Sequence, residues 1–139
     1  MATDAPTPLD EAAFVRSVRE GRVVVSSGPF VTLHAEAAGG RATIGDTIEA
    51  GEVELTVRVD APPWMTLGHV EVLRRGVPIA RWSLKDADED AHPRLTSSHR
   101  TRVTNGDWVI AVVDGGSTMD GYYRSGARPF AFTNPIFVR

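Results

Sequence analysis

The sequence predicts an all-β fold, an immunoglobulin-like antiparallel β-sandwich of about seven strands preceded by one short α-helix. Three observations lead to this fold class. Short β-rich segments recur along the chain, turn residues separate them at intervals of roughly 8 to 12 positions, and a single amphipathic helical segment precedes them. We therefore expect residues 1–21 to form a disordered lead and a helix, and residues 22–139 to form the sandwich domain.

The composition is that of an ordinary globular domain. The 139 residues are 42% hydrophobic and 24% charged, with a net charge of -3 that gives no reason to expect nucleic acid as a partner. The absence of cysteine excludes disulfides, thiol nucleophiles and thiolate metal sites. The sequence carries neither a signal-peptide pattern nor an apolar stretch that would insert into a membrane, and it assigns no compartment.

A helix of about 12 residues is expected near the start of the chain. Thr7 can cap it, Pro8 suits its first position, and Gly21 ends it. Its short apolar stripe consists of Leu9, Ala13 or Phe14, and Val18. A helix this short is marginal in water, so we expect it to lie on another surface.

The first strands follow the helix. Residues 22–27 and 30–36 are β-rich and flank Gly28-Pro29, a break that can bend a strand or start an edge. Residues 52–60 form the clearest strand, because valine and leucine alternate there with charged residues and threonine. Pro62-Pro63 ends this strand.

The later strands are expected over residues 69–74, 78–84, 94–104, 108–114 and 128–138. Arg75-Gly76 has the length and the glycine expected of a hairpin, and Asn105-Gly106 is the strongest short hairpin signal in the chain. An acidic loop over residues 85–93 and a glycine-rich loop over residues 115–126 connect the remaining strands.

Several strands are apolar on both alternate rows, notably residues 23–25, 108–113 and 128–138. A free antiparallel sheet normally leaves one face to water, so a doubly apolar strand needs cover on both sides. The sequence therefore predicts an additional layer over one sheet. The isolated chain is expected to expose an apolar patch and to form a weak homodimer.

The order of six short motifs suggests a family. These motifs are Glu20-Gly21-Arg22, the strand and turn of residues 23–30, Ile44-Gly45-Asp46, Ala61-Pro62-Pro63-Trp64, Val70-Glu71-Val72-Leu73, and residues 128–136. Together they cover nearly the whole chain. Their succession resembles the C-terminal region of PHP-type metal-dependent hydrolases of the CehA/McbA branch.

The resemblance implies that a catalytic (β/α)-barrel precedes this chain, with residues 8–21 as its end or satellite. It implies a non-catalytic accessory sandwich whose partner is that upstream domain of the same polypeptide. No cofactor is expected in this chain, because the family's divalent-metal ligands lie in the missing domain and match no position here. The turn containing Ser27, Gly28 and Pro29 is expected to reach the interdomain boundary or the rim of the active site, together with the glycine-rich loop.

The alternative is a carbohydrate or cell-surface binding module. Trp64, Tyr122 and Tyr123 can form a platform on which a sugar ring stacks. The same aromatic residues can also be explained as packing at the edge of the sandwich or against a neighbouring domain.

The polar residues give weak signals for metal binding or catalysis. His92 and His99 are seven positions apart, and solvated loop residues explain them better than a metal site. Asp86-x-Asp88-x-Asp90 begins like a calcium loop, but the glycine and glutamate that such a loop needs further on are missing. Adjacent residues on a strand face opposite ways, so Ser98 and His99 do not form a catalytic pair. We expect no catalysis by this chain alone and no metal site in it.

Overall fold

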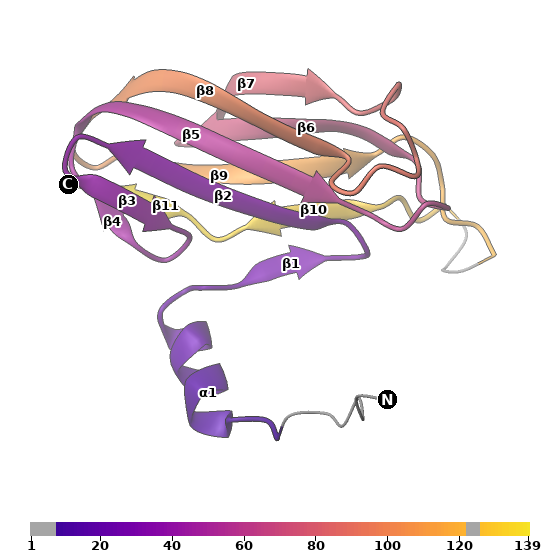
Figure 1. Ribbon diagram of the computed structural model, residues 1–139, viewed down its shortest axis with the longest axis horizontal. Coiled ribbons are helices and arrows are strands. Elements are labelled where there is room, and N and C mark those ends of the chain that lie inside the picture. Colours follow the sequence, from indigo (N-terminus) through magenta and orange to yellow (C-terminus); the bar gives the residue numbers. More distant parts are fainter. Residues whose placement is uncertain (1–7, 122–125) are drawn as a thin grey trace, which may run out of the picture.

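The computed structural model describes residues 8–121 and 126–139. Within these residues the chain forms a β-sandwich of two sheets, with seven and four strands, and one short helix (Figure 1). This confirms the predicted fold class. The strands are more numerous than predicted because two short segments, Gly40–Thr43 and Thr47–Ile48, each add to an edge of one sheet, and because the last predicted strand is divided.

The four-stranded sheet has the order β3 (Gly40–Thr43), β2 (Phe30–Ala37), β5 (Gly51–Asp60) and β8 (Leu95–Val103). β5 pairs antiparallel with β2 on one side and with β8 on the other. As the alternation of its residues predicted, the apolar row of β5 is buried inside the sandwich and the other row faces outward.

The seven-stranded sheet is built around β9 (Trp108–Gly115). One edge of β9 pairs with β6 (Leu67–Arg74), which in turn pairs with β7 (Val77–Ser83). The other edge pairs with β10 (Phe130–Thr133) and β11 (Ile136–Val138), and these pair outward with β1 (Val24–Ser26) and the parallel β4 (Thr47–Ile48).

The final strand is divided at Asn134-Pro135, where a single strand was expected. Proline has no N–H to donate to a ladder. The flanking groups bond elsewhere: Asn134 donates its N–H to the Val23 carbonyl at 3.1 Å, and the Pro135 carbonyl accepts from the N–H of Gly45 at 2.9 Å. Because the strand is divided, β10 pairs on its outer edge with β1 and β11 pairs with β4.

Of the two predicted hairpins, one is confirmed and one is wrong. Arg75 and Gly76 have φ values of 51° and 81° and join β6 to β7, as a type I′ turn requires. Asn105-Gly106 also forms a turn, but β8 lies in the four-stranded sheet and β9 in the seven-stranded sheet. The turn therefore carries the chain across the sandwich, because β8 pairs with β5 and not with β9.

The core lies between the inward faces of the two sheets. Leu33 and Val57 from the smaller sheet and Val72, Ala111 and Ile136 from the larger sheet are almost completely excluded from solvent. Both sheets contribute to one continuous apolar cluster. The sandwich therefore has its own core and needs no further layer to bury it.

The helix α1 (Glu11–Arg19) is shorter than predicted. Asp10 is its N-cap and accepts a hydrogen bond from the N–H of Ala13 at 3.0 Å, so Pro8 precedes the helix instead of starting it. Thr7 lies outside the described residues. Gly21 ends the helix as predicted: its φ is 72°, and the N–H groups of Gly21 and Arg22 bond back to the carbonyls of Val18 and Ser17.

The helix lies beyond β1 and away from both sheets (Figure 1). None of its residues is buried. Its C-terminal end is held against the sandwich, because a Cβ placed on Gly45 would come within 2.1 Å of the Glu20 carbonyl oxygen. Arg22 adds ion pairs to Glu20 at 3.3 Å and to Asp46 at 3.4 Å. The sandwich therefore fixes where the helix ends but gives its sides no cover.

Among residues 8–121 and 126–139, no helix has both the length and the apolarity needed to cross a membrane.

Candidate interaction surface

The outward side of the seven-stranded sheet carries a group of apolar side chains that are exposed or, on β9, half-buried. Val25 on β1 pairs with Phe132 on β10, and Phe132 pairs with Val112 on β9, so these three form one row across the sheet. Phe130 stacks on Phe132, with ring centroids 6.4 Å apart. We call the whole group the apolar face: Val25, Trp108, Ile110, Val112, Phe130, Phe132 and Phe137.

The helix adds a second uncovered apolar surface. Its outward residues Phe14, Val15 and Val18 are exposed, and so is Leu9 just before it. We call these four residues the helix stripe. The expected stripe is present, although Val15 belongs to it and the half-buried Ala13 does not.

The uncovered area is comparable to the largest apolar patch of an ordinary monomer. Phe14, Phe130, Phe132 and Phe137 are 39–60% exposed. At roughly 150–250 Å² for each aromatic side chain, the three phenylalanines of the apolar face leave about 200–320 Å² of apolar surface open to water, and Phe14 leaves about 90–150 Å² open on the helix stripe. The largest apolar patch on a typical monomer is about 300–600 Å² and is often functional. With the aliphatic residues added, the area suits one side of an ordinary protein interface, which is about 800 Å².

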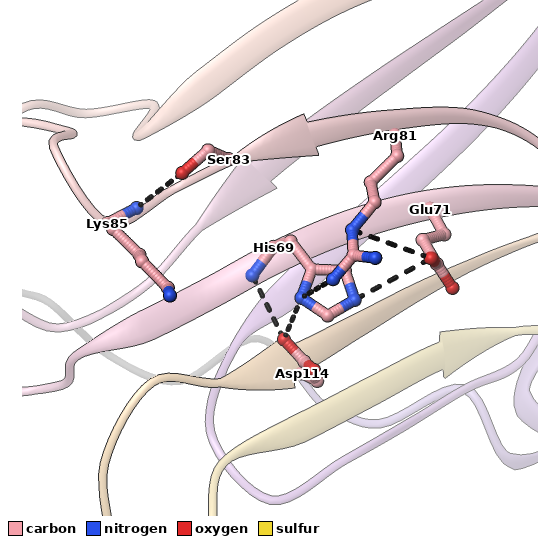
Figure 2. A network of polar contacts seen from close by, with 6 residues as sticks. All are labelled: His69, Glu71, Arg81, Ser83, Lys85 and Asp114. Carbon is pink, nitrogen blue, oxygen red and sulfur yellow. Dashed lines mark hydrogen bonds and ion pairs between the residues drawn. The ribbon is translucent and has the colours of Figure 1, made fainter.

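A network of charged groups borders the apolar face (Figure 2). It consists of His69 and Glu71 on β6, Arg81 on β7, and Asp114 on β9. We call these four residues the polar border. Its carboxylates adjoin the apolar face directly, because Glu71 pairs with Val112 and Asp114 pairs with Phe130.

The imidazole of His69 is at the centre of the polar border (Figure 2). Its Nδ1 lies 2.8 Å from Asp114 Oδ1 and 3.0 Å from Arg81 Nη2. A single ring nitrogen either donates or accepts, so it makes one of these two hydrogen bonds at a time. Glu71 Oε1 lies 3.7 Å from His69 Nε2 and 3.6 Å from Arg81 Nε. Two carboxylates thus face one guanidinium and one titratable ring.

Backbone geometry brings Asp114 into the polar border. Asp114 Oδ1 accepts a hydrogen bond from the His69 N–H at 2.9 Å, at a point where the pairing of β6 and β9 shifts register. Gly68 permits this approach, because a Cβ there would lie 2.6 Å from the same oxygen. Sequence reasoning did not bring these residues together. It missed the network because Asp114 is 45 positions from His69 and only the sheet topology brings them together.

The predicted turn residues Ser27, Gly28 and Pro29 lie where the chain crosses from β1 to β2, that is, from one sheet to the other. The Ser27 hydroxyl accepts a hydrogen bond from the Phe130 N–H at 2.9 Å. A Cβ on Gly28 would lie 2.2 Å from the Met65 Cε, and Pro29 is buried. These residues hold the crossing in place beside the apolar face, and their interdomain or ligand-binding role stays a prediction.

Trp64 is 49% exposed and follows β5 in the loop before β6. It borders a cavity of about 60 Å³ together with Met65, Met119 and Pro129. Ligand pockets usually measure about 300–1,000 Å³, so the described residues leave no ligand-sized cavity at this point. Tyr122 and Tyr123 lie outside the described residues, and the sugar platform stays a prediction.

His92, which precedes β8, and His99, which lies in β8, are not close to each other. His92 Nδ1 lies 2.9 Å from Asp60 Oδ1, and this hydrogen bond is the main cause of a lowered pKa for the Asp60 carboxyl. His99 pairs instead with Leu55. Leu55 lies five positions before Asp60 on β5, which corresponds to about 16 Å at 3.3 Å per residue. Within the part of the chain that the structure describes, no three metal-ligating side chains gather at one point.

No protein-family model, curated protein or solved structure matches this chain. The sandwich and its uncovered surfaces are therefore the observations from which a function can be argued.

Proposed function

We propose that this chain is a non-catalytic accessory domain that docks through the apolar face and the helix stripe onto a catalytic domain of the same polypeptide. Following the resemblance of its motifs, we propose that the catalytic domain is the metal-binding barrel of a PHP-type hydrolase. In this role the sandwich shields apolar surface on the barrel and fixes the position of the segment that joins the barrel to the sandwich.

The observation that supports this proposal most directly is the doubly apolar character of β9, β10 and β11. Their inward rows are buried in the core, and their outward phenylalanines remain 39–46% exposed. Leaving so much contiguous apolar area in water is costly, and in soluble proteins such a patch usually marks a contact with another protein surface. The chain's own helix lies elsewhere and does not cover it.

The position of the helix favours a partner attached upstream. α1 precedes β1, and β1 is an outer strand of the sheet that carries the apolar face. A domain joined to the start of α1 is therefore close to the helix stripe. The polar border suits the rim of such a contact, because protein interfaces commonly have an apolar centre and a polar edge.

The proposal is tested first on the coding DNA immediately upstream of the codon for residue 1. We expect an uninterrupted reading frame that encodes a barrel with paired histidines. An in-frame stop codon followed by a ribosome-binding site at this point contradicts the accessory-domain proposal.

The docking itself is tested in the longer protein by comparing Phe132→Glu with Thr56→Glu, which places the same charge on the outward side of the other sheet. We expect Phe132→Glu to expose the segment between the two domains to a protease and to lower the melting temperature of the assembly. Thr56→Glu should change neither. Equal behaviour of the two variants contradicts docking through the apolar face.

A further inference from the structure

β8 forms one outer edge of the four-stranded sheet and is long and regular. All nine of its residues pair with β5, from Val103 opposite Gly51 to Leu95 opposite Val59, with no bulge. Within residues 8–121 and 126–139, no second strand pairs with it. In such a strand every second residue turns its N–H and C=O away from the sheet. One of these carbonyls, that of Arg102, already accepts a hydrogen bond from Arg74 Nη1 at 2.8 Å. The remaining groups make β8 a template on which another strand can pair.

The other outer strands of the described chain are protected against strand addition. β7 contains Pro78, and its pairing with β6 shifts register between Val72 and Leu73. β3, β1 and β4 are only four, three and two residues long. Proline, bulges, short length and charged side chains are the usual ways to blunt a sheet edge, and of these β8 has only the charged side chains of Arg100 and Arg102.

The inward row of β8 is incompletely covered. Leu95, Ser97, His99 and Thr101 point to the inside of the sandwich but are only half-buried, whereas the corresponding row of β5 is buried. On β7, Trp82 packs against the margin of the core and is also half-buried. The side of the sandwich between β8 and β7 is thus partly open.

We propose that β8 pairs antiparallel with β8 of a second copy of this chain, which joins two four-stranded sheets into one eight-stranded sheet. The two-fold axis passes through His99. This contact lies on the smaller sheet, so it is separate from the apolar face and does not depend on the proposed docking function.

The side chains of β8 are self-complementary in the register that pairs all nine residues. Each His99 lies opposite the other, and Leu95 lies opposite Val103, so the apolar ends of the inward row meet. On the outward row Ser98 faces Arg100 and Thr96 faces Arg102. Arginines therefore oppose hydroxyl groups, whereas a shift of two residues in one direction sets Arg100 against the Arg100 of the other copy.

The arginines are also balanced within each copy. Arg100 Nε lies 3.3 Å from Glu54 Oε1, and Arg102 Nη1 lies 3.9 Å from Glu52 Oε1. Both glutamates are on β5 of the same sheet. The outward row of β8 is thus close to neutral when a second copy approaches.

A single cysteine tests this register, because the chain has no cysteine of its own. In His99→Cys the two Cα atoms lie about 4.5–5.5 Å apart across the two-fold axis, within the range of about 4.4–6.8 Å that a disulfide spans. We expect mild oxidation to give a covalent dimer. Thr101→Cys is the matched control, because position 101 faces position 97 and not itself. It should stay monomeric alone and cross-link when mixed with Ser97→Cys.

A charge pair at Ser98 tests the contact without a cross-link. Ser98 is exposed, and both Ser98→Lys and Ser98→Glu lose the same hydrogen bond to Thr56, so they are matched in the single copy. Opposite Arg100 of the second copy, lysine should weaken dimerisation about tenfold and glutamate should strengthen it about threefold at low salt. Sedimentation equilibrium measures both changes, and circular dichroism checks the fold.

The proposal is overturned if His99→Cys stays monomeric, if Thr101→Cys alone links as fast as His99→Cys, or if the two Ser98 variants dimerise equally. Phe132→Glu separates this outcome from a dimer formed through the apolar face. The variant should leave the His99→Cys link unchanged, and loss of the link with Phe132→Glu assigns self-association to the apolar face instead.

Discussion

The outward sides of the two sheets differ, although their inward sides are alike. On the four-stranded sheet the outward row of β5 is charged or hydroxylated. The ion pair of Glu54 with Arg100 joins β5 to β8, and that of Glu36 with Arg41 joins β2 to β3 in the same sheet. On the seven-stranded sheet the same position in the layer is taken by valine, isoleucine and phenylalanine. The first surface is polar and suits contact with water, whereas the second leaves apolar side chains exposed.

This difference shows what each alternation in the sequence encodes. One polar and one apolar row specify a sheet that separates a core from solvent. Two apolar rows place one row in the core and leave the other row apolar on the outward side. At the polar border on β6 and β7, the larger sheet again has one apolar inward row and one polar outward row.

The largest expected difference in the free energy of unfolding is between substitutions in the inward rows and substitutions in the outward rows. Leu33→Ala and Ile136→Ala remove side chains that are fully buried, one from each sheet, and each should lower the free energy of unfolding by about 2–5 kcal/mol. Their outward neighbours Thr32→Ala and Phe137→Ala should cost under about 1 kcal/mol each in the isolated chain. Urea denaturation gives all four values, and a loss above about 2 kcal/mol for Phe137→Ala contradicts an uncovered apolar face.

A smaller effect is expected at Asp107, on the turn that joins the two sheets. Asp107 is 5% exposed, and its Oδ2 accepts hydrogen bonds from the N–H and the hydroxyl of Thr104 at 2.9 and 3.1 Å. The backbone hydrogen bond is the main cause of a lowered pKa for this carboxyl. Asp107→Ala should cost about 1–3 kcal/mol at neutral pH, because Thr104 is left without its acceptor.

The pH dependence of the Asp107 effect follows from the direction of the shift. A folded-state pKa below the unfolded value of about 3.9 contributes stability above that pH, and the contribution is lost as the pH falls through the folded value. The difference between wild type and Asp107→Asn should therefore be constant near neutrality and shrink in acid below about pH 4.

The smallest effect on stability is expected when phenylalanine and threonine side chains are exchanged between the outward sides of the two sheets. This exchange also tests the difference between the two sides most directly. Phe130→Thr with Phe132→Thr removes roughly 100–200 Å² of exposed apolar area and should lower the fluorescence of a bound hydrophobic dye by about a third to a half. Thr56→Phe should raise it. Both proteins should unfold within about 1 kcal/mol of wild type. Unchanged dye binding in both variants means that the dye reports some other surface.

The sequence predicted most strands and their inward rows because alternation is local. The row of β5 and the turn at Arg75-Gly76 are examples in which a few neighbouring residues determine the outcome. The Asn105-Gly106 turn is a counterexample, because the same dipeptide fits a turn between paired strands and a turn between sheets. Which one forms is decided by the partners of β8 and β9, which lie far away in the chain.

The candidate surface was predictable in kind but not in detail. The double apolar rows of residues 108–113 and 128–138 indicated that one side would stay uncovered. They did not indicate that Val25, Phe132 and Val112 form one row, since that depends on the register of three strands. The polar border was beyond sequence reasoning for the same reason. The start of the helix was placed too early because Pro8 and Asp10 are both good starting residues, and the cap at Asp10 prevails.

The close approach of Gly45 to the Glu20 carbonyl has a consequence for motion. Because that contact and the Arg22 ion pairs fasten the last turn of α1, the helix should rotate in solution as one body with the sandwich, and not as a tethered appendage. Nitrogen-15 relaxation of its amides would then report the same correlation time as β5. A larger side chain at position 45 should release the helix and give its amides a faster, independent tumbling.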